Sequence, residues 1–264
     1  MTALSVNLNK IALLRNSREG TYPSVTEFGN LALEMGADGL TVHPRPDQRH
    51  IRVDDVIALS IQIKEFNQVN ALHKEFNIEG NPFAEAKLAS SETMTAYPGL
   101  MSLIDQTRPD QATLVPDNNT QLTSDHGFDL RQDGDKLLPI VEQLKQWKVR
   151  CSLFMDADCH QISLAKELGV ERIELYTGPY ALASKHSSIE QEKSLAQYKE
   201  ACNHALDIGL AVNAGHDLNL NNLKQFLAIG DIAEVSIGHA LTVDALLLGY
   251  KNAIVDYSRI CHFE

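Results

Sequence analysis

Short apolar runs rich in β-branched residues alternate with longer amphipathic segments along the whole chain. Short runs of this kind are typical of buried strands, and apolar residues three to four positions apart are typical of helices. We expect strands at 4–9, 39–43, 75–79, 111–116, 150–156, 172–177, 210–215 and 233–237, and helices at 25–36, 53–67, 83–107, 132–147, 160–168, 187–208, 219–229 and 242–257. The third helix should be broken, because prolines interrupt it.

Eight strand–helix units in succession predict a parallel sheet, and eight is the number of units that closes into a (β/α)8 TIM barrel. The sequence shows no linker, low-complexity tract or repeat, so residues 1–264 should form a single α/β domain with extra helical segments. Its length suits one such barrel.

Capping residues agree with these boundaries. Gly36, Gly169 and Gly209 each follow a predicted helix and precede a predicted strand, as helix C-terminal glycines do. Asp158 should cap the helix at 160–168 with Gln161 as its capping-box partner. Thr242 should cap the last helix.

Composition narrows the function class. A net charge of −12 argues against a nucleic-acid partner, although Arg45, Arg49, His50 and Arg52 form a local cationic cluster suited to anionic small substrates. With no signal peptide and no apolar run long enough for a membrane, we expect a cytoplasmic protein with reduced thiols. The four cysteines show no zinc spacing, and nothing nearby orients Cys159 and His160 as a nucleophilic pair.

Three expected strands end on a histidine, namely His43, His216 and His239. The carboxyl ends of parallel strands are where a (β/α)8 barrel carries its chemistry. His43 opens a loop stiffened by prolines, in which Arg45 and His50 could hold a phosphate or carboxylate through charge-assisted hydrogen bonds. The intrinsic pKa of a histidine such as His43 is near neutral and suits proton transfer. The alternative is that the whole segment is a solvated basic loop.

Two glutamates lie on expected strands. Alternation places Asn77 and Glu79 on one face at the end of the third strand, where Glu79 is either catalytic or part of a rim salt bridge. Glu174 lies inside the sixth strand, which requires either an ion pair with a core lysine or arginine or a catalytic role.

The turns after strands seven and eight, Asn213–His216 and Ile237–Ala240, contain glycines where barrels commonly bind phosphate. On the first strand Asn7 and Asn9 share a face. Lys10 behind them is either an imine-forming amine or, as we favour, a hydrogen-bonding cation.

Asp156 and Asp158 could bind a metal ion together with the histidines. Asp158 is already explained as a helix cap, so we expect no metal site.

These motifs together resemble the pyridoxine 5′-phosphate synthase family, (β/α)8 barrels of vitamin B6 biosynthesis. The likeness runs in the family's order over nearly the whole chain. It rests on Val6-Asn7, Ile11-Ala12, Leu14-Arg15-Asn16, Gly36-Ala37-Asp38-Gly39, Thr41-Val42-His43, Arg45, Arg49-His50-Ile51, Asn77-Ile78-Glu79, Leu114-Val115-Pro116, Ser152-Leu153-Phe154, Asp156-Ala157-Asp158, Ile173-Glu174, Thr177-Gly178, Tyr180-Ala181, Val212-Asn213-Ala214-Gly215-His216 and Ile237-Gly238-His239-Ala240.

The resemblance implies that 3-amino-2-oxopropyl phosphate condenses with 1-deoxy-D-xylulose 5-phosphate to give pyridoxine 5′-phosphate, phosphate and water. The substrate supplies the amine, so no cofactor, metal or lysine imine is implied. It also implies a homo-oligomer, an octamer built from dimers, in which Arg18 reaches a neighbour's site.

The resemblance assigns roles by position. His43 and Glu79 are implied to be general bases, His216 the proton donor, and Glu174 a stabiliser of charged intermediates. The implied ligands of deoxyxylulose phosphate are Arg45, His50 and Thr123, helped by Asn9 and Lys10, and those of the amino-ketone phosphate are Asn7, Arg18, Gly238 and His239. The backbone N–H of Asp217 is a further candidate phosphate donor.

The chain departs from the best-known form of the family in three places. Asn9-Lys10 stand where that form has Asp-His, which removes an acid–base role there but keeps an acceptor and a donor. Asp217 replaces a glycine and brings a carboxylate near a phosphate. The segment after Glu79 is longer.

Two other functions stay open from the residues alone. A sugar-phosphate epimerase or aldolase barrel would need a metal or an imine-forming lysine. A non-catalytic barrel that binds phosphorylated ligands predicts loss of proton-transfer groups, whereas His43, Glu79, Glu174 and His216 are all present.

Overall fold

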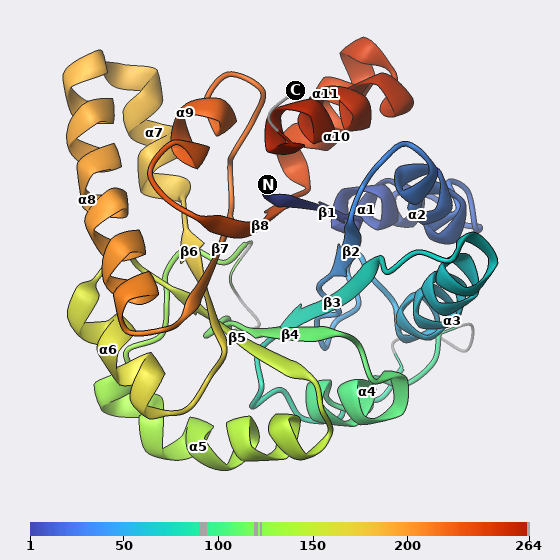
Figure 1. Cartoon of the computed structure of the whole chain (residues 1–264). Coiled ribbons are helices and arrows are strands. Elements are labelled where there is room, and N and C mark those ends of the chain that lie inside the picture. Colours follow the sequence, from blue (N-terminus) through green and yellow to red (C-terminus); the bar gives the residue numbers. More distant parts are fainter. Residues whose placement is uncertain (90–93, 119–120, 122, 263–264) are drawn as a thin grey trace.

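A closed barrel of eight parallel strands, in the order of the sequence, forms the centre of the computed structural model, which describes residues 1–89, 94–118, 121 and 123–262 (Figure 1). The predicted (β/α)8 fold is therefore confirmed. The strands are β1 (Ala3–Asn7), β2 (Gly39–Val42), β3 (Glu75–Gly80), β4 (Gln111–Leu114), β5 (Arg150–Met155), β6 (Arg172–Tyr176), β7 (Ala211–Gly215) and β8 (Ile232–Ile237).

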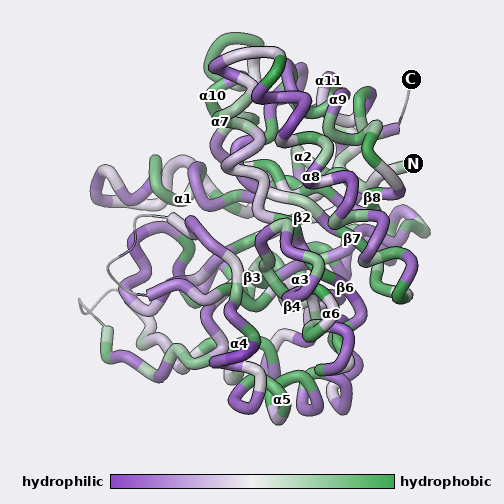
Figure 2. Tube along the Cα trace, turned by 90° about the vertical axis from the view of Figure 1, so that its left-hand side faces the viewer, coloured by the Kyte–Doolittle hydropathy of each residue, from purple (hydrophilic) through white to green (hydrophobic). Residues whose placement is uncertain are grey.

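Helices surround the barrel in Figure 1, and most of them bury an apolar side while α10 leaves several apolar side chains exposed. They are α1 (Asn9–Asn16), α2 (Val25–Glu34), α3 (Val53–Asn70), α4 (Leu100–Thr107), α5 (Leu130–Gln146), α6 (Cys159–Glu167), α7 (Gly178–His186), α8 (Ser188–Asp207), α9 (Leu223–Leu227), α10 (His239–Leu248) and α11 (Tyr250–His262). Hydrophobic and hydrophilic residues alternate along α5 in Figure 2.

Some predicted elements differ from the structure. Of the helix expected at 83–107, the described residues form only α4, which begins after Pro98 and Gly99, and residues 90–93 lie outside the described part of the chain. The helix expected at 242–257 is two helices, because Gly249 between them has a φ of 84°. The first strand ends at Asn7, and the α1 and α7 helices were not predicted.

The expected caps are partly confirmed. Gly36, Gly169 and Gly209 have φ values of 108°, 82° and 77°, as helix-ending glycines do. Asp158 accepts hydrogen bonds from the backbone N–H groups of His160 and Gln161. The capping-box partner is wrong, because the Gln161 side chain contacts the neighbouring segment instead, where its Oε1 accepts from Leu130 N at 2.8 Å.

The expected cap at Thr242 is also wrong. The α10 helix already begins at His239, and Thr242 lies inside it. Its hydroxyl donates to the Gly238 carbonyl at 2.9 Å, which is a bond within the helix.

The apolar core lies between the strands and the helices, whereas the barrel interior is polar. Ser5 and Thr41 hydroxyls lie 2.6 Å apart, and the Asn77 side chain bonds both Thr41 and Thr113. Barrel interiors are usually filled with branched apolar side chains. In this chain the interior instead continues the polar character of its mouth.

No helix among the described residues is long and apolar enough to cross a membrane.

Candidate active site

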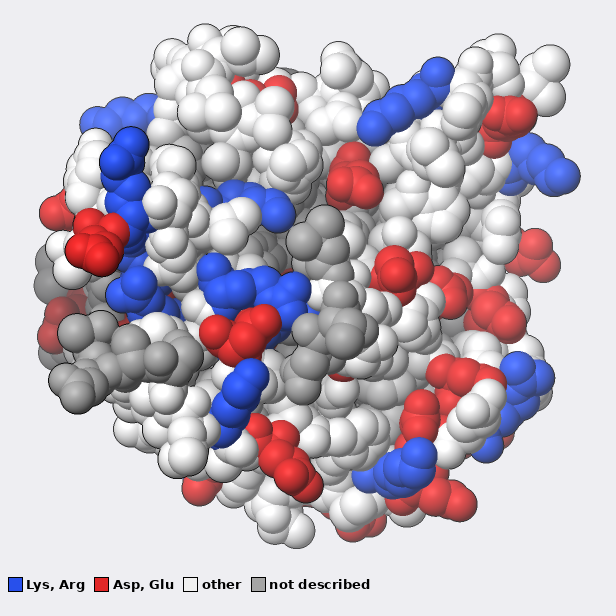
Figure 3. Space-filling model, turned by 180° about the vertical axis from the view of Figure 1, so that it is seen from behind, with Lys and Arg blue, Asp and Glu red and all other residues white. Residues whose placement is uncertain are grey.

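A cavity of 310 Å³ opens at the carboxyl ends of the strands. Its lining includes most of the residues expected from sequence, namely Asn7, Asn9, Lys10, His43, Arg45, His50, Glu79, Thr123, Glu174, His216, Asp217, Gly238 and His239. Lys and Arg side chains gather near the middle of the face seen in Figure 3. Such a cluster attracts anions although the whole chain is acidic.

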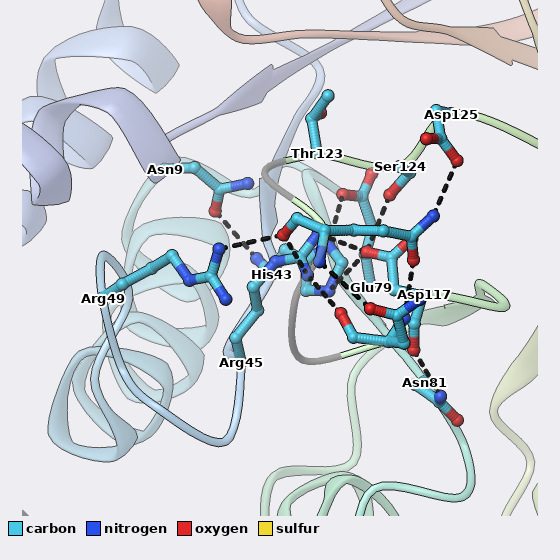
Figure 4. Close-up of polar contacts among 12 residues, drawn as sticks. Asn9, His43, Arg45, Arg49, Glu79, Asn81, Asp117, Thr123, Ser124 and Asp125 are labelled. Atoms are coloured by element: carbon cyan, nitrogen blue, oxygen red, sulfur yellow. Dashed lines mark hydrogen bonds and ion pairs between the residues drawn. The ribbon is translucent and has the colours of Figure 1, made fainter.

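His43 lies at the end of β2 between two carboxylates (Figure 4). Its Nδ1 is 3.9 Å from Glu79 Oε2, and its Nε2 is 3.6 Å from Asp117 Oδ2. Asn9 Oδ1 accepts a hydrogen bond from the His43 backbone N–H at 2.9 Å. Burial, followed by the nearby Arg45, lowers the pKa of His43 well below its usual value, so the ring is neutral and able to accept a proton.

Glu79 points into the barrel mouth, as the strand alternation predicts. It accepts hydrogen bonds of 3.3 Å from Asn7 Nδ2 and from Ser236 Oγ. The described residues give it no lysine or arginine ion pair, so the rim salt bridge does not account for it. Burial raises the pKa of Glu79 to about 8, which lets it either give or take a proton near neutral pH.

Glu174 is buried on β6. Its Oε2 has no hydrogen-bond partner within the described chain, and no ion pair with a lysine or arginine is found there. The structural ion pair that was one alternative for this residue is therefore contradicted. Burial, and then the charge of Glu79, raise the pKa of Glu174 well above its usual value. A buried carboxyl group left unpaired at a cavity is a candidate for function.

Gly215 on β7 makes room for this glutamate. A Cβ atom at position 215 would lie 2.2 Å from Glu174 Oε1, far inside contact distance. We expected Gly215 to let a phosphate come close to the backbone. In the structure, the absence of a side chain at Gly215 leaves space for the Glu174 carboxyl group.

His216 faces the cavity from the turn after β7. Its Nε2 lies 3.0 Å from the Thr123 hydroxyl, and its ring contacts Tyr176 with centroids 5.3 Å apart. Burial lowers the pKa of His216, so the ring is neutral before substrate binds. His216 and Asp217 have φ values of 88° and 59°, a conformation that glycine adopts freely and Asp tolerates. The Asp217 side chain is exposed.

Arg45 and His50 lie together in the loop after β2. Arg45 is buried and forms an ion pair with Asp117. The backbone N–H of Ile51 donates to His50 Nδ1 at 2.9 Å, and burial, followed by the charge of Arg45, lowers the pKa of His50 to about 3. His50 is therefore a neutral donor through Nε2 rather than the cation expected from sequence.

Asn7 and Gly238 are packed against each other, because a Cβ on Gly238 would come within 3.0 Å of Asn7 Cβ. Gly238 precedes α10, and His239 is its first residue, so free backbone N–H groups face an incoming anion. Lys10 belongs to the first turn of α1 rather than to a loop. Arg18 is exposed and does not line this cavity.

Sequence reasoning missed Asp117, Ser124 and Ser236. Asp117 directly follows the motif Leu114-Val115-Pro116 after β4, so the rule that selected Glu79 would also have selected it. Ser124 Oγ donates to Asp117 Oδ2 at 2.9 Å, and Ser236 donates to Glu79. Both serines are placed by the fold, and their local sequence carries no signal.

The described residues give no support to a metal site at Asp156 and Asp158 or to a nucleophilic thiol at Cys159. Asp156 is exposed, and Asp158 caps α6. No cluster of three or more His, Cys, Asp or Glu side chains suited to a metal occurs in the part of the chain that the structure describes. Burial raises the pKa of the Cys159 thiol, which is the opposite of an activated nucleophile.

Comparison with solved structures shows the fold. A 3-keto-L-gulonate-6-phosphate decarboxylase from Vibrio cholerae superposes with a TM-score of 0.56 at 9% identity, covering 100% of this chain and 99% of that one. A phosphoribosylanthranilate isomerase from Thermotoga maritima superposes with a TM-score of 0.56 at 10% identity, covering 100% of both chains.

Sequence comparison is far more specific. The pyridoxine 5′-phosphate synthase of Xanthomonas campestris pv. campestris (strain B100) is 50% identical over 261 residues, which cover 98% of this chain and 96% of that protein. The synthase of Xylella fastidiosa (strain 9a5c) is 49% identical over 257 residues, covering 97% of this chain and 93% of that protein. The family model for the pyridoxal phosphate biosynthesis protein PdxJ matches residues 4–262. The chain therefore belongs to the PdxJ family, the pyridoxine 5′-phosphate synthases of vitamin B6 biosynthesis.

Proposed function

We propose that the cavity joins 3-amino-2-oxopropyl phosphate to 1-deoxy-D-xylulose 5-phosphate, giving pyridoxine 5′-phosphate, phosphate and water. The observation that carries the proposal is the convergence of four proton-transfer groups, His43, Glu79, Glu174 and His216, on one cavity. Imine formation, loss of phosphate and dehydration are all proton-transfer steps. Side chains whose shifted pKa values let them accept or donate a proton near neutral pH suit such a series of steps.

Each of these groups has a distinct role in the proposal. Neutral His43 takes a proton from the substrate, and Glu79, with a pKa of about 8, takes or returns another. A bound phosphate dianion beside His216 would raise the pKa of its ring, and the protonated ring then donates its proton to a departing oxygen. A cationic imine beside Glu174 would lower the pKa of this carboxyl group, so the carboxylate and the cation stabilise each other.

The two phosphates are assigned to opposite sides of the cavity. Arg45, His50 and Thr123, with Asn9 and Lys10, hold deoxyxylulose phosphate. The α10 N-terminus at Gly238 and His239, with Asn7, holds the amino-ketone phosphate, and the Asp217 backbone N–H supports it. Because the amino-ketone carries its own amine, the proposed reaction uses no lysine imine, metal or organic cofactor.

The test is a coupled assay with both substrates and EDTA, in which phosphate release and pyridine absorbance are followed together. We expect His43→Ala and Glu79→Gln each to lower kcat by about 10²-fold or more, as loss of a proton-transfer group does. His160→Ala, which removes an exposed histidine outside the cavity, is the matched control and should be unaffected.

Equal rates in wild type and both site variants would contradict the assignment. Borohydride trapping of Lys10, or inhibition by EDTA, would instead favour the aldolase or epimerase alternative. Binding without turnover would favour the non-catalytic barrel.

The same proposal makes the enzyme a cytoplasmic homo-oligomer, an octamer built from dimers by family resemblance. Four apolar side chains of α10 are exposed, Val243 at 42%, Leu246 at 78%, Leu247 at 82% and Leu248 at 42%. Contiguous apolar surface of this kind supports contact with a second copy. Arg18, exposed just beyond α1, is free to reach a neighbour's cavity. All four cysteines are free thiols, as in a reducing compartment.

A further inference from the structure

Asp117 already occupies the anion-binding side of Arg45. Its side chain is 4% exposed and forms an ion pair with Arg45 through Oδ2, which also accepts from Ser124 Oγ at 2.9 Å. Figure 4 shows Asp117 below Ser124, with Arg45 entering the group from the opposite side. The residue proposed to hold a substrate phosphate therefore carries an internal carboxylate when the cavity is empty.

A phosphate and this carboxylate cannot share the site at little cost. Both bind a guanidinium through the same N–H donors. Two anions in contact repel each other strongly in a buried setting, where water screens them poorly. A phosphate that takes the Nη2 donors of Arg45 therefore displaces the Asp117 side chain.

A second cavity offers room for the displaced side chain. It measures 430 Å³, and its polar lining includes His43, Arg45, Asn81, Glu85, Lys87, Tyr97 and Asp117. His43 and Arg45 line both this cavity and the active-site cavity, and Asp117, which lines the second cavity, contacts both of them.

Two polar atoms on the lining residues of this second cavity are unused. Tyr97 is 1% exposed, and among the described residues its hydroxyl has no hydrogen-bond partner. Within the same part of the chain Asp117 Oδ1 also has none. Buried polar atoms are rarely left unpaired. A hydroxyl donor and a carboxylate acceptor that line one cavity are complementary. Asn81 Nδ2 donates to the Asp117 carbonyl and so holds the main chain while the side chain turns.

We infer that Asp117 is a built-in competitor for the phosphate site, which holds Arg45 in the empty enzyme and yields to a substrate phosphate by turning toward Tyr97 and Lys87. The inference rests on the proposed function, because it takes Arg45 as a phosphate ligand. It also gives a reason for selectivity, since a sugar without a phosphate has no charge with which to displace the carboxylate. Tyr97 and Lys87 both belong to the segment after Glu79 that is longer than in the best-known form of the family.

The test is calorimetric titration of the whole protein with inorganic phosphate. Asp117→Asn removes the competing charge but keeps the shape, so phosphate should bind about tenfold more tightly or better. Asp125→Asn removes an equal charge from the same segment, where Asp125 bonds Gln121 and His126 but not Arg45, and should change the affinity less than about twofold. Adding Arg45→Ala to Asp117→Asn should abolish the gain.

Equal or weaker phosphate binding by Asp117→Asn overturns the inference, because Asp117 would then only position Arg45. Tyr97→Phe provides an independent measure, since it should weaken phosphate binding in the wild-type background and have no effect beside Asp117→Asn. Additive effects of the two substitutions also overturn it. The ring-forming assay is read separately. A protein without that activity whose phosphate affinity follows these expectations loses the proposed function but keeps the exchange at Arg45.

Discussion

At the scale of single residues, the unusual feature of this barrel is a set of buried glutamates that lack a full ion pair. Glu79 and Glu174 lie in the mouth, and both have raised pKa values because burial disfavours the charged form. Glu234, deeper in the barrel, has a pKa raised to about 7 by burial although Arg172 is 3.4 Å away. Such groups oppose folding whenever they must be ionised.

A pH dependence of stability follows from Glu79. Its pKa is about 8 in the folded protein and lower, at the ordinary glutamate value of 4.5, in the unfolded chain. Above pH 4.5 the unfolded chain releases this proton first, so the free energy of unfolding falls as the pH rises from 4.5 toward 8. Glu79→Gln cannot ionise, and we expect it to remove at least about 1 kcal/mol of that decline.

Urea unfolding at several pH values between 5 and 8 measures the effect. Glu167→Gln, which alters an exposed glutamate at the end of α6, is the control. An identical decline in wild type and Glu79→Gln would show that Glu79 is ionised in the folded protein.

Gly215→Ala tests the space around Glu174. Because the added methyl group would lie 2.2 Å from Glu174 Oε1, that carboxyl group must move or the strand must shift. We expect a loss of about 1–3 kcal/mol of stability, typical of overpacking, and a drop in kcat larger than the change in KM. Gly169→Ala, with no atom within 4 Å of the added carbon, separates crowding from loss of glycine, although its φ of 82° adds some strain.

The sequence identified polar residues at strand ends because the two-residue period of a strand decides which face each occupies. His43 and Glu79 were found in this way, and both line the cavity. It could not find Ser124 or Ser236, whose hydrogen bonds join residues far apart in sequence, as with Ser236 and Glu79. The neutral state of His50 also depends on burial, which sequence does not report.

At the scale of elements, the eight strands were predictable and several helices were not. Apolar, β-branched runs bounded by glycine mark a buried parallel strand in any sequence. The α1 helix was missed because it follows β1 after one residue, so the two patterns merge. The predicted helix began at residue 83, yet Lys87 and Tyr97 pair as an antiparallel bridge, which depends on contacts across the segment.

The caps give a paired test at this scale. Asp158→Ala removes the side chain that accepts from two N–H groups of α6, and should cost about 1 kcal/mol of stability. Thr242→Val lies inside α10, where loss of the hydroxyl should change stability by less than about 0.5 kcal/mol. Thermal unfolding of both variants measures the difference. A larger loss from Thr242→Val would restore the role first expected for that residue.

At the scale of the whole molecule, the exposed apolar side chains of α10 are the feature that a single chain does not explain. If a second copy covers it, Leu246→Glu combined with Leu247→Glu should reduce the mass measured by light scattering. Val69→Glu, at a residue 83% exposed on α3, makes a similar change elsewhere and should leave the mass unaltered. An unaltered mass in the α10 variant would place the contact on another face.

The barrel closes through residues from opposite ends of the sequence. Ala3 pairs with Glu234 between β1 and β8, and the Thr2 N–H donates to the Cys261 carbonyl at 3.1 Å. During translation the edge of β1 that pairs with β8 therefore stays unpaired until β8 has left the ribosome. Unpaired strand edges promote association with other chains. The nascent chain is thus most exposed to misassembly, and most in need of a chaperone, just before its synthesis is complete.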